Sequence, residues 1–180
     1  MNKGCIFVGG VHGSGKTQLC KKIQEIIPCK YILASQLLHW EKKEKKVENV
    51  QGNQFVLKKL LEENTQKEER YLIDGHFALW NNNFECEKVP LYLFENLNLK
   101  CIIVVEANID AISERLLLRD NKMIEIEKIR QLKEAERENA ELVAQNLNIP
   151  IYSVVNLDTN QIVDLINSIG DFYGEQRGIH

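Results

Sequence analysis

The stretch of sequence that decides the fold lies early in the chain and reads Gly10-Val11-His12-Gly13-Ser14-Gly15-Lys16-Thr17. Its spacing, G-x-x-x-x-G-K-[ST], is the P-loop pattern. Glycines let the backbone turn with its N–H groups pointing inward, where they form a nest for phosphate oxygens. Lys16 is expected to reach the β and γ phosphates of ATP, and the Thr17 hydroxyl to bind Mg²⁺. The residues predicted to bind the nucleotide are therefore Gly10, Gly13, Ser14, Gly15, Lys16 and Thr17.

The residues on either side of the loop have the context that a P-loop requires. Residues 4–8 form an apolar run typical of a buried strand. Residues 16–27 place apolar side chains at helical spacing, and Pro28 ends that helix. A strand, a glycine-rich turn and a helix thus follow one another in the order that phosphate binding needs. The sequence indicates no specific role for His12, inside the loop, which fits a filler of the loop better than a catalytic residue.

The remainder of the chain alternates between apolar strands and amphipathic helices. Strands are predicted at residues 31–34, 71–73, 101–105 and 149–155, and helices at residues 53–63, 124–147 and 159–169. Two further helices are predicted to begin at Ser35 and Asp110, which act as N-caps. Strands that are apolar throughout and are each followed by a helix indicate a parallel sheet covered on both faces. We predict one α/β domain over residues 1–180: a three-layer P-loop fold with a five-stranded parallel sheet.

Composition narrows the classes of function. The chain has 180 residues, 44% of them hydrophobic and 27% charged, and a net charge of −3. An acidic balance argues against a main role in binding nucleic-acid phosphates. The five cysteines are scattered without a CxxC pair, which disfavours a zinc site or a disulfide framework. No apolar run approaches the roughly 18 residues of a membrane span. We expect no signal peptide and a cytoplasmic location.

An acid follows the third predicted strand. The sequence there is Tyr71-Leu72-Ile73-Asp74-Gly75-His76. In P-loop proteins an acid at this place holds Mg²⁺ directly or through water, so Thr17 and Asp74 are the predicted metal-binding pair. Asp74 could instead be an ordinary turn residue. His76 lies beside it and is predicted either to contact the substrate or to make a structural hydrogen bond.

Two arginines lie four residues apart on the helix after the fourth strand. Arg115 and Arg119 therefore share a helix face, and Arg119 precedes the polar stretch Asp120-Asn121-Lys122. Planar guanidinium groups suit the charge that develops on a migrating phosphoryl group. Lys16, Arg115 and Arg119 are the predicted catalytic residues. The alternative is that both arginines are solvated and paired with local acids.

The chain resembles the nucleoside monophosphate kinase superfamily, and most of all the archaeal-type adenylate kinases and related small AAA-type ATP-binding proteins. The resemblance spans about residues 4–166 and rests on residues 10–17, Ser35, residues 74–76, residues 106–108, Arg115, residues 119–120, residues 134–140 and residues 149–156.

That resemblance implies a five-stranded parallel sheet with an acceptor region at about residues 35–67 and a short lid at about residues 119–125. It implies that Ser35 and the segment to about Phe55 face the acceptor and that Arg119 is a lid arginine. Together with Ser35, Asp74 and His76 are the predicted substrate-binding residues. It places the segment that contains Asn156 against the adenine.

Three functions are compatible with these observations. The first is transfer of the γ-phosphate of Mg·ATP to a nucleoside monophosphate or similar small acceptor. The second is an ATP-binding switch or slow ATPase that acts through a protein partner or a second copy of the chain. The third, which the net acidity disfavours, is a kinase acting on nucleic-acid ends. Trp40 and Trp80 fit a base-stacking wall, a partner patch or ordinary core filling.

Overall fold

The computed structural model describes residues 3–42, 50–121 and 123–172. Its central sheet contains five strands in the order β2-β3-β1-β6-β7, and every pair of neighbours is parallel. The strands are β1 (Gly4–Gly9), β2 (Lys30–Leu33), β3 (Arg70–Asp74), β6 (Leu99–Glu106) and β7 (Ile151–Val155). The predicted five-stranded parallel sheet is confirmed.

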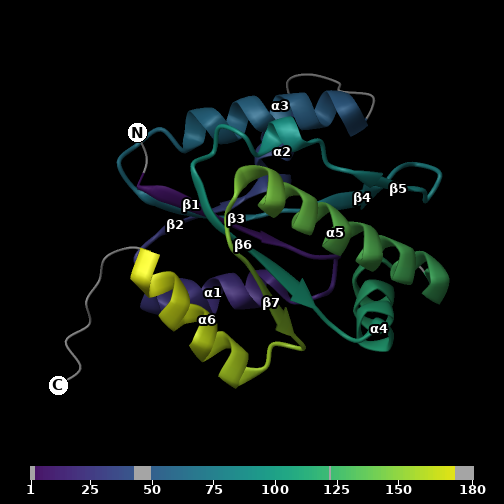
Figure 1. Ribbon diagram of the computed structural model, residues 1–180. Coiled ribbons are helices and arrows are strands. Elements are labelled where there is room, and N and C mark those ends of the chain that lie inside the picture. The colour runs from purple at the N-terminus through teal and green to yellow at the C-terminus, as the bar shows by residue number, and fades with distance from the viewer. Residues whose placement is uncertain (1–2, 43–49, 122, 173–180) are drawn as a thin grey trace.

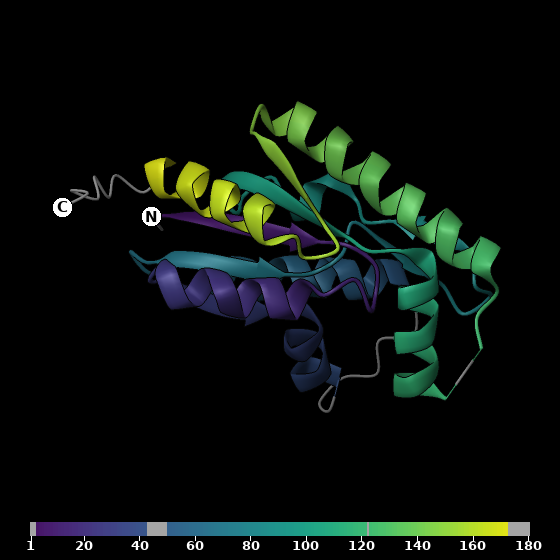
Figure 2. The same ribbon diagram turned by 90° about the horizontal axis from the view of Figure 1, so that it is seen from below.

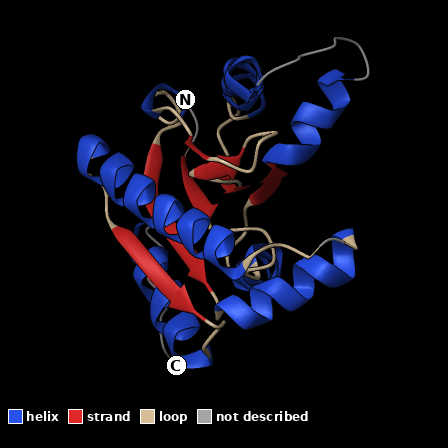
Figure 3. Ribbon diagram, turned by 90° about the vertical axis from the view of Figure 1, so that its right-hand side faces the viewer, coloured by secondary structure: helices blue, strands red, loops and turns tan. Residues whose placement is uncertain are grey.

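Helices cover both faces of this sheet (Figures 1 and 3). On one face lie α1 (Lys16–Ile26) and α6 (Thr159–Phe172). On the other lie α3 (Val50–Asn64), α5 (Ile126–Leu147) and the short 3-10 helix η1 (Leu91–Leu93). The three-layer α/β arrangement is therefore confirmed.

Alternation along the strands divides the core into two apolar layers. In β1, Phe7 points to the α3 and α5 side, while Ile6 and Val8 point to the α1 and α6 side. Successive side chains of a strand point to opposite faces, so one strand fills both layers. The first layer includes Leu61, Phe77, Phe94 and Val143, and the second includes Leu19, Ile23, Val154 and Ile166.

Two helices extend from the end of the sheet at which the carboxyl ends of the strands lie. They are α2 (Ala34–Lys42), which continues directly from β2, and α4 (Ile109–Asp120), which follows β6. Figure 2 shows both helices extending to the same side of the molecule. The registers Leu33↔Asp74 and Val8↔Asp74 bring the ends of β2, β3 and β1 together there. Ligands of open α/β sheets bind at this edge.

Two predicted helix caps are wrong. The helix after β2 already includes Ala34, so Ser35 lies in its first turn and does not cap it. The helix after β6 has Asn108 as its N-cap, in an extended conformation, and Asp110 lies inside the first turn. An acid there still interacts favourably with the positive end of the helix dipole.

The sequence patterns also missed a small antiparallel hairpin. It pairs β4 (Ala78–Trp80) with β5 (Cys86–Lys88), directly after β3. Other boundaries differ by a few residues: the long helix begins at Ile126, the last strand at Ile151, and the last helix continues to Phe172. Residues 43–49 of the predicted acceptor region, and residue 122 of the predicted lid, lie outside the described part of the chain.

Candidate phosphotransfer site

The loop between β1 and α1 has the backbone conformation that its glycines permit. Gly10 has a φ of +142° and Gly15, the N-cap of α1, a φ of +104°. A Cβ at Gly10 would lie 2.4 Å from the Val105 carbonyl oxygen. Glycine is the residue that adopts such positive φ angles without steric strain. The loop therefore turns tightly enough to place Lys16 in the first turn of α1.

Lys16 is almost fully buried, with 8% of its surface exposed. Its Nζ donates hydrogen bonds to the carbonyl oxygens of Gly10 at 2.7 Å and Val11 at 3.1 Å. Burial lowers the pKa of this ammonium group, while the nearby Glu136 and Asp74 raise it. A cation held over the loop by backbone oxygens is placed to bind a phosphate.

Asp74, at the end of β3, is 2% exposed and accepts two hydrogen bonds on one oxygen. Thr17 Oγ1 donates to Oδ2 at 3.0 Å, and the Tyr31 hydroxyl donates to the same oxygen at 2.8 Å. Burial and the Asp74 carboxylate raise the pKa of Tyr31, so Tyr31 stays a donor. The structure thus brings the predicted metal-binding pair together, and hydroxyl and carboxylate oxygens are ligands that Mg²⁺ prefers.

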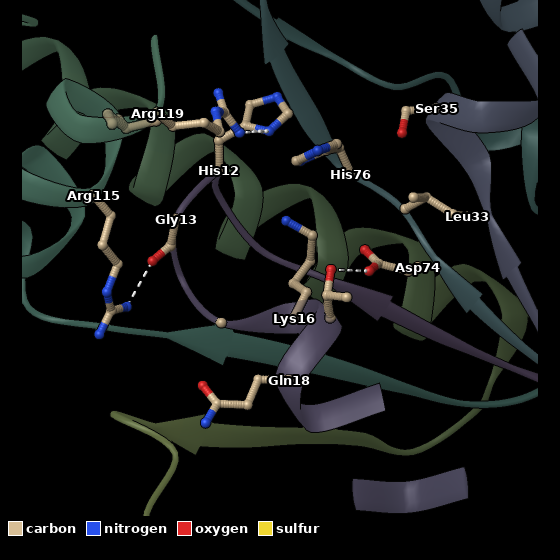
Figure 4. A pocket seen from close by; sticks show the side chains of 13 residues that line it. His12, Gly13, Lys16, Gln18, Leu33, Ser35, Asp74, His76, Arg115 and Arg119 are labelled. Carbon is tan, nitrogen blue, oxygen red and sulfur yellow. Dashed lines mark hydrogen bonds between the residues drawn. The ribbon is translucent and has the colours of Figure 1, made fainter. Parts of the chain in front are cut away.

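A pocket of about 520 Å³ opens over these groups (Figure 4). The predicted site residues that line it are Gly13, Gly15, Lys16, Thr17, Ser35, Asp74, His76, Arg115 and Arg119. His12, Gln18, Leu33 and Leu116 complete its lining. Its walls come from the P-loop, α1, the ends of β2 and β3, α2 and α4. The pocket therefore joins the phosphate loop to the predicted acceptor side.

The three remaining predicted residues do not line the pocket. Gly10 lies in the loop, and Ser14 is fully buried, with its N–H donating to the Val11 carbonyl. Asn156 Oδ1 accepts from the Asn108 N–H at 2.9 Å and so ties the loop after β7 to the loop after β6. Its neighbour Leu157 packs against Gly15, since a Cβ on that glycine would lie 3.0 Å from Leu157 Cδ1. The role of Asn156 against adenine stays a prediction.

The two predicted catalytic arginines hold different partners. Arg115 Nη1 donates to the Gly13 carbonyl at 2.7 Å, which attaches α4 to the P-loop. Arg119 donates through two nitrogens to the two oxygens of Asp120. Its third nitrogen, Nη1, lies 3.5 Å from His12 Nδ1. Figure 4 shows the Arg115 guanidinium beside Gly13 and the Arg119 guanidinium beside His12, and both residues line the pocket.

The sequence analysis missed a buried carboxylate behind the pocket. Glu136, on α5, has Oε1 2.9 Å from His76 Nδ1, and its Oε2 accepts from the Phe77 N–H at 2.7 Å. Burial raises the pKa of Glu136 to about 7 against the charge of Lys16, and burial lowers the pKa of His76 well below its ordinary value. The sequence could have indicated this residue, because Glu136 interrupts the apolar face of the helix that Ile129 and Leu132 begin.

These residues fit Mg·ATP. The glycine cradle would be filled by a Cβ at Gly10, Lys16 supplies a buried cation, and the N-terminus of α1 supplies a positive dipole end. Thr17 and Asp74 offer oxygens beside it. Among the described residues no group of three or more His, Cys, Asp or Glu side chains is arranged to hold a metal. Within the same residues no helix is long and apolar enough to span a membrane.

Comparison with known proteins identifies the family. Residues 9–133 match the model of the AAA domain family, which covers well over half of the chain. The chain therefore belongs to the AAA domain family. No curated protein sequence matches it.

Several solved kinases share the fold. A gluconokinase from Sinorhizobium meliloti 1021 is 14% identical, with a TM-score of 0.60 and 94% of both chains covered. A deoxyadenosine kinase from M. mycoides is 16% identical, with a TM-score of 0.58 and coverage of 93% of this chain and 98% of that one. A shikimate kinase from Bacteroides thetaiotaomicron is 18% identical, with a TM-score of 0.58 and coverage of 93% and 97%. At these identities the likeness concerns the fold.

Proposed function

We propose that this protein is a small-molecule kinase that transfers the γ-phosphate of Mg·ATP to a nucleoside monophosphate or a similar small acceptor. The observation that carries the proposal is the pocket, which has the P-loop, Lys16 and the Thr17–Asp74 pair on one side and Ser35, His76 and Arg119 on the other. The structural similarity to three kinases of small molecules supports the same reaction class. The particular likeness to archaeal-type adenylate kinases remains part of the proposal.

Catalysis in this reaction class comes mostly from positioning and from stabilising charge. Lys16 would bind the β and γ phosphates of the donor, and Thr17 with Asp74 would hold Mg²⁺. When bound, Mg²⁺ neutralises charge on the phosphate oxygens. Arg115 and Arg119 would bind the migrating phosphoryl group from the α4 side.

The acceptor would enter between α2 and α4. Leu33 and Ser35 form this side of the pocket with His76, so the acceptor meets both an apolar and a hydrogen-bonding surface. From the predicted acceptor region at residues 35–67, Ser35 lines the pocket, and from the predicted lid at residues 119–125, Arg119 lines it.

The test measures ADP formation with a panel of nucleoside monophosphates and common hydroxylated metabolites. We expect at least one acceptor to raise ADP formation well above the basal rate. Lys16→Ala should abolish that turnover, because the ammonium binds charge that grows in the transition state. Lys21→Ala, an exposed lysine farther along α1, is the matched control and should keep the wild-type rate.

Two results would overturn the proposal. Wild-type turnover in Lys16→Ala would remove the P-loop from the reaction. Basal hydrolysis that no small acceptor raises, but that a protein partner does raise, would favour the switch or slow ATPase.

A further inference from the structure

Glu136 lies where the packing of α5 calls for an apolar side chain. The buried face of that helix includes Ile129, Leu132 and Val143, and Glu136 lies among them with 1% of its surface exposed. Removing a carboxylate from water has a large unfavourable free energy, which an apolar residue would avoid. A packing role therefore does not account for this side chain.

Both oxygens of Glu136 contact the segment that follows β3. Oε1 lies 2.9 Å from His76 Nδ1, and Oε2 accepts from the Phe77 N–H at 2.7 Å. The second bond fixes the backbone directly after His76, and the first fixes its ring. The side chain of His76 is 14% exposed, so the ring is held from behind while part of it faces the pocket.

The His76 ring in turn contacts the P-loop. Its centroid lies 4.2 Å from that of the His12 ring, and His12 Nδ1 lies 3.5 Å from Arg119 Nη1. Figure 4 shows the two rings near each other, close to the amine of Lys16. Contacts thus run from Glu136 on α5 through two histidines to Arg119 on α4.

We propose that Glu136 is a positioning residue, which acts through its hydrogen bond to Nδ1 by holding the His76 ring in place at the acceptor side of the pocket. This inference rests on the proposed function for its kinetic consequence, while the geometry of the His76 ring does not depend on any reaction. Loss of a residue that orients a metal ligand through a hydrogen bond typically costs about 10- to 100-fold in metal affinity or activity, and we expect a loss of that order for a residue that orients His76.

The first measurement needs neither ATP nor an acceptor, so it stays informative even if the proposed function fails. Under the proposal, Glu136→Gln shifts the Hε1 and Cε1 NMR signals of His76. The amide has a single acceptor oxygen, so with that oxygen on the Phe77 N–H it can only donate to Nδ1, which changes either the tautomer or the position of the ring. The control Glu134→Gln changes an exposed acid two residues earlier on α5 and should leave those signals in place. Unshifted His76 signals in a folded Glu136→Gln protein would overturn the proposal.

The second measurement is a double-mutant cycle with a working acceptor. Glu136→Gln should lower kcat by about tenfold or more. In the His76→Ala background the same change should alter kcat by less than about twofold, because its effect passes through the missing ring. A full loss in both backgrounds would show that Glu136 acts through Lys16 or the backbone instead, and would overturn the proposal.

Glu136→Asp separates position from charge and also serves if the glutamine variant does not fold. It keeps the carboxylate but withdraws it by one methylene from His76 Nδ1. Under the proposal its kcat falls as in Glu136→Gln. A wild-type kcat in Glu136→Asp would show that only the charge matters and would contradict the positioning role.

Discussion

Arg119 is the residue whose chemistry best separates phosphoryl transfer from simple ATP binding. Its guanidinium group is half-exposed at the end of α4, held by Asp120 and directed toward the pocket. Arg119→Lys keeps the charge but loses the planar fork. We expect kcat to fall roughly tenfold to a thousandfold, about 1.4 to 4 kcal/mol, with a smaller change in the ATP Kd.

The comparison requires kcat with a working acceptor and the ATP Kd for each protein. Arg130→Lys is the control, because Arg130 is exposed on α5 and pairs with Glu127 away from the pocket. An equal loss in ATP affinity and in kcat/KM would show that Arg119 only holds ATP.

We expect Glu136 to make the free energy of unfolding depend on pH. Burial raises its pKa from 4.5 to about 7 in the folded protein, where it faces His76 and Lys16. The folded state thus binds the proton more tightly than the unfolded state. Its contribution to stability is fully present below about pH 4.5 and is lost as the pH rises to about 7.

Glu136→Gln removes this titration, so wild type should lose stability relative to the variant as the pH rises through that window. The measurement is the free energy of unfolding in urea for both proteins across the window. A constant difference between them would mean that the carboxyl group ionises with its ordinary pKa.

At the scale of elements, α5 fixes the hairpin that follows β3. Asn139 is buried one turn after Glu136, and its Nδ2 donates to the Phe77 carbonyl at 2.7 Å and the Val89 carbonyl at 2.8 Å. These bonds hold both ends of the hairpin against the helix. Asn139→Leu removes this donor from the Val89 carbonyl, while the Phe77 carbonyl keeps the Val89 N–H as a donor at 2.8 Å, so the change should cost about 1 to 3 kcal/mol of unfolding free energy.

The matched control is Asn146→Leu, two turns later on α5, where the side chain is exposed and Nδ2 donates to the Leu142 carbonyl of its own helix. We expect it to change stability by about 0.5 kcal/mol or less. Equal losses in the two variants, measured by thermal or urea unfolding, would show that the bonds from Asn139 do not anchor the hairpin.

Hydrophobic periodicity predicted the elements that are long or uniformly apolar. Strand β6 and helix α5 were readable in this way, and the P-loop fixed the order of strand, turn and helix at the start of the sheet. Strands β4 and β5 have three residues each and pair mainly with one another, so they carry too little pattern to detect. The caps failed because Ser35 and Asp110 suit a first turn as well as a cap.

The residues of the candidate site were also only partly predictable from the sequence. Thr17 and Asp74 were predictable because a motif places one and a strand end places the other, and the Val8↔Asp74 register joins them. Tyr31 was not, because its hydroxyl contacts Asp74 only through the pairing of β2 with β3. Glu136 belongs to a helix rich in exposed glutamates, and only its place on the apolar face distinguishes it.

At the scale of the whole molecule, the parallel sheet brings the residues of the candidate site together. The ends of β1, β2 and β3 meet at one edge, and the helices that leave this end of the sheet, α1, α2 and α4, contribute the remaining pocket residues. Under the proposed function, this one pocket holds a donor over the P-loop and an acceptor between α2 and α4. The proposed function thus requires that the γ-phosphate passes directly from bound ATP to a bound acceptor.

The fate of the γ-phosphate tests that claim most directly. Wild type is incubated with Mg·ATP labelled at the γ position and with the acceptor that raises ADP formation, and the labelled products are separated by chromatography. We predict that the label moves to the organic acceptor in an amount equal to the ADP formed, and that Lys16→Ala forms no such product. Label found only in inorganic phosphate, at a rate that no acceptor changes, would contradict the account.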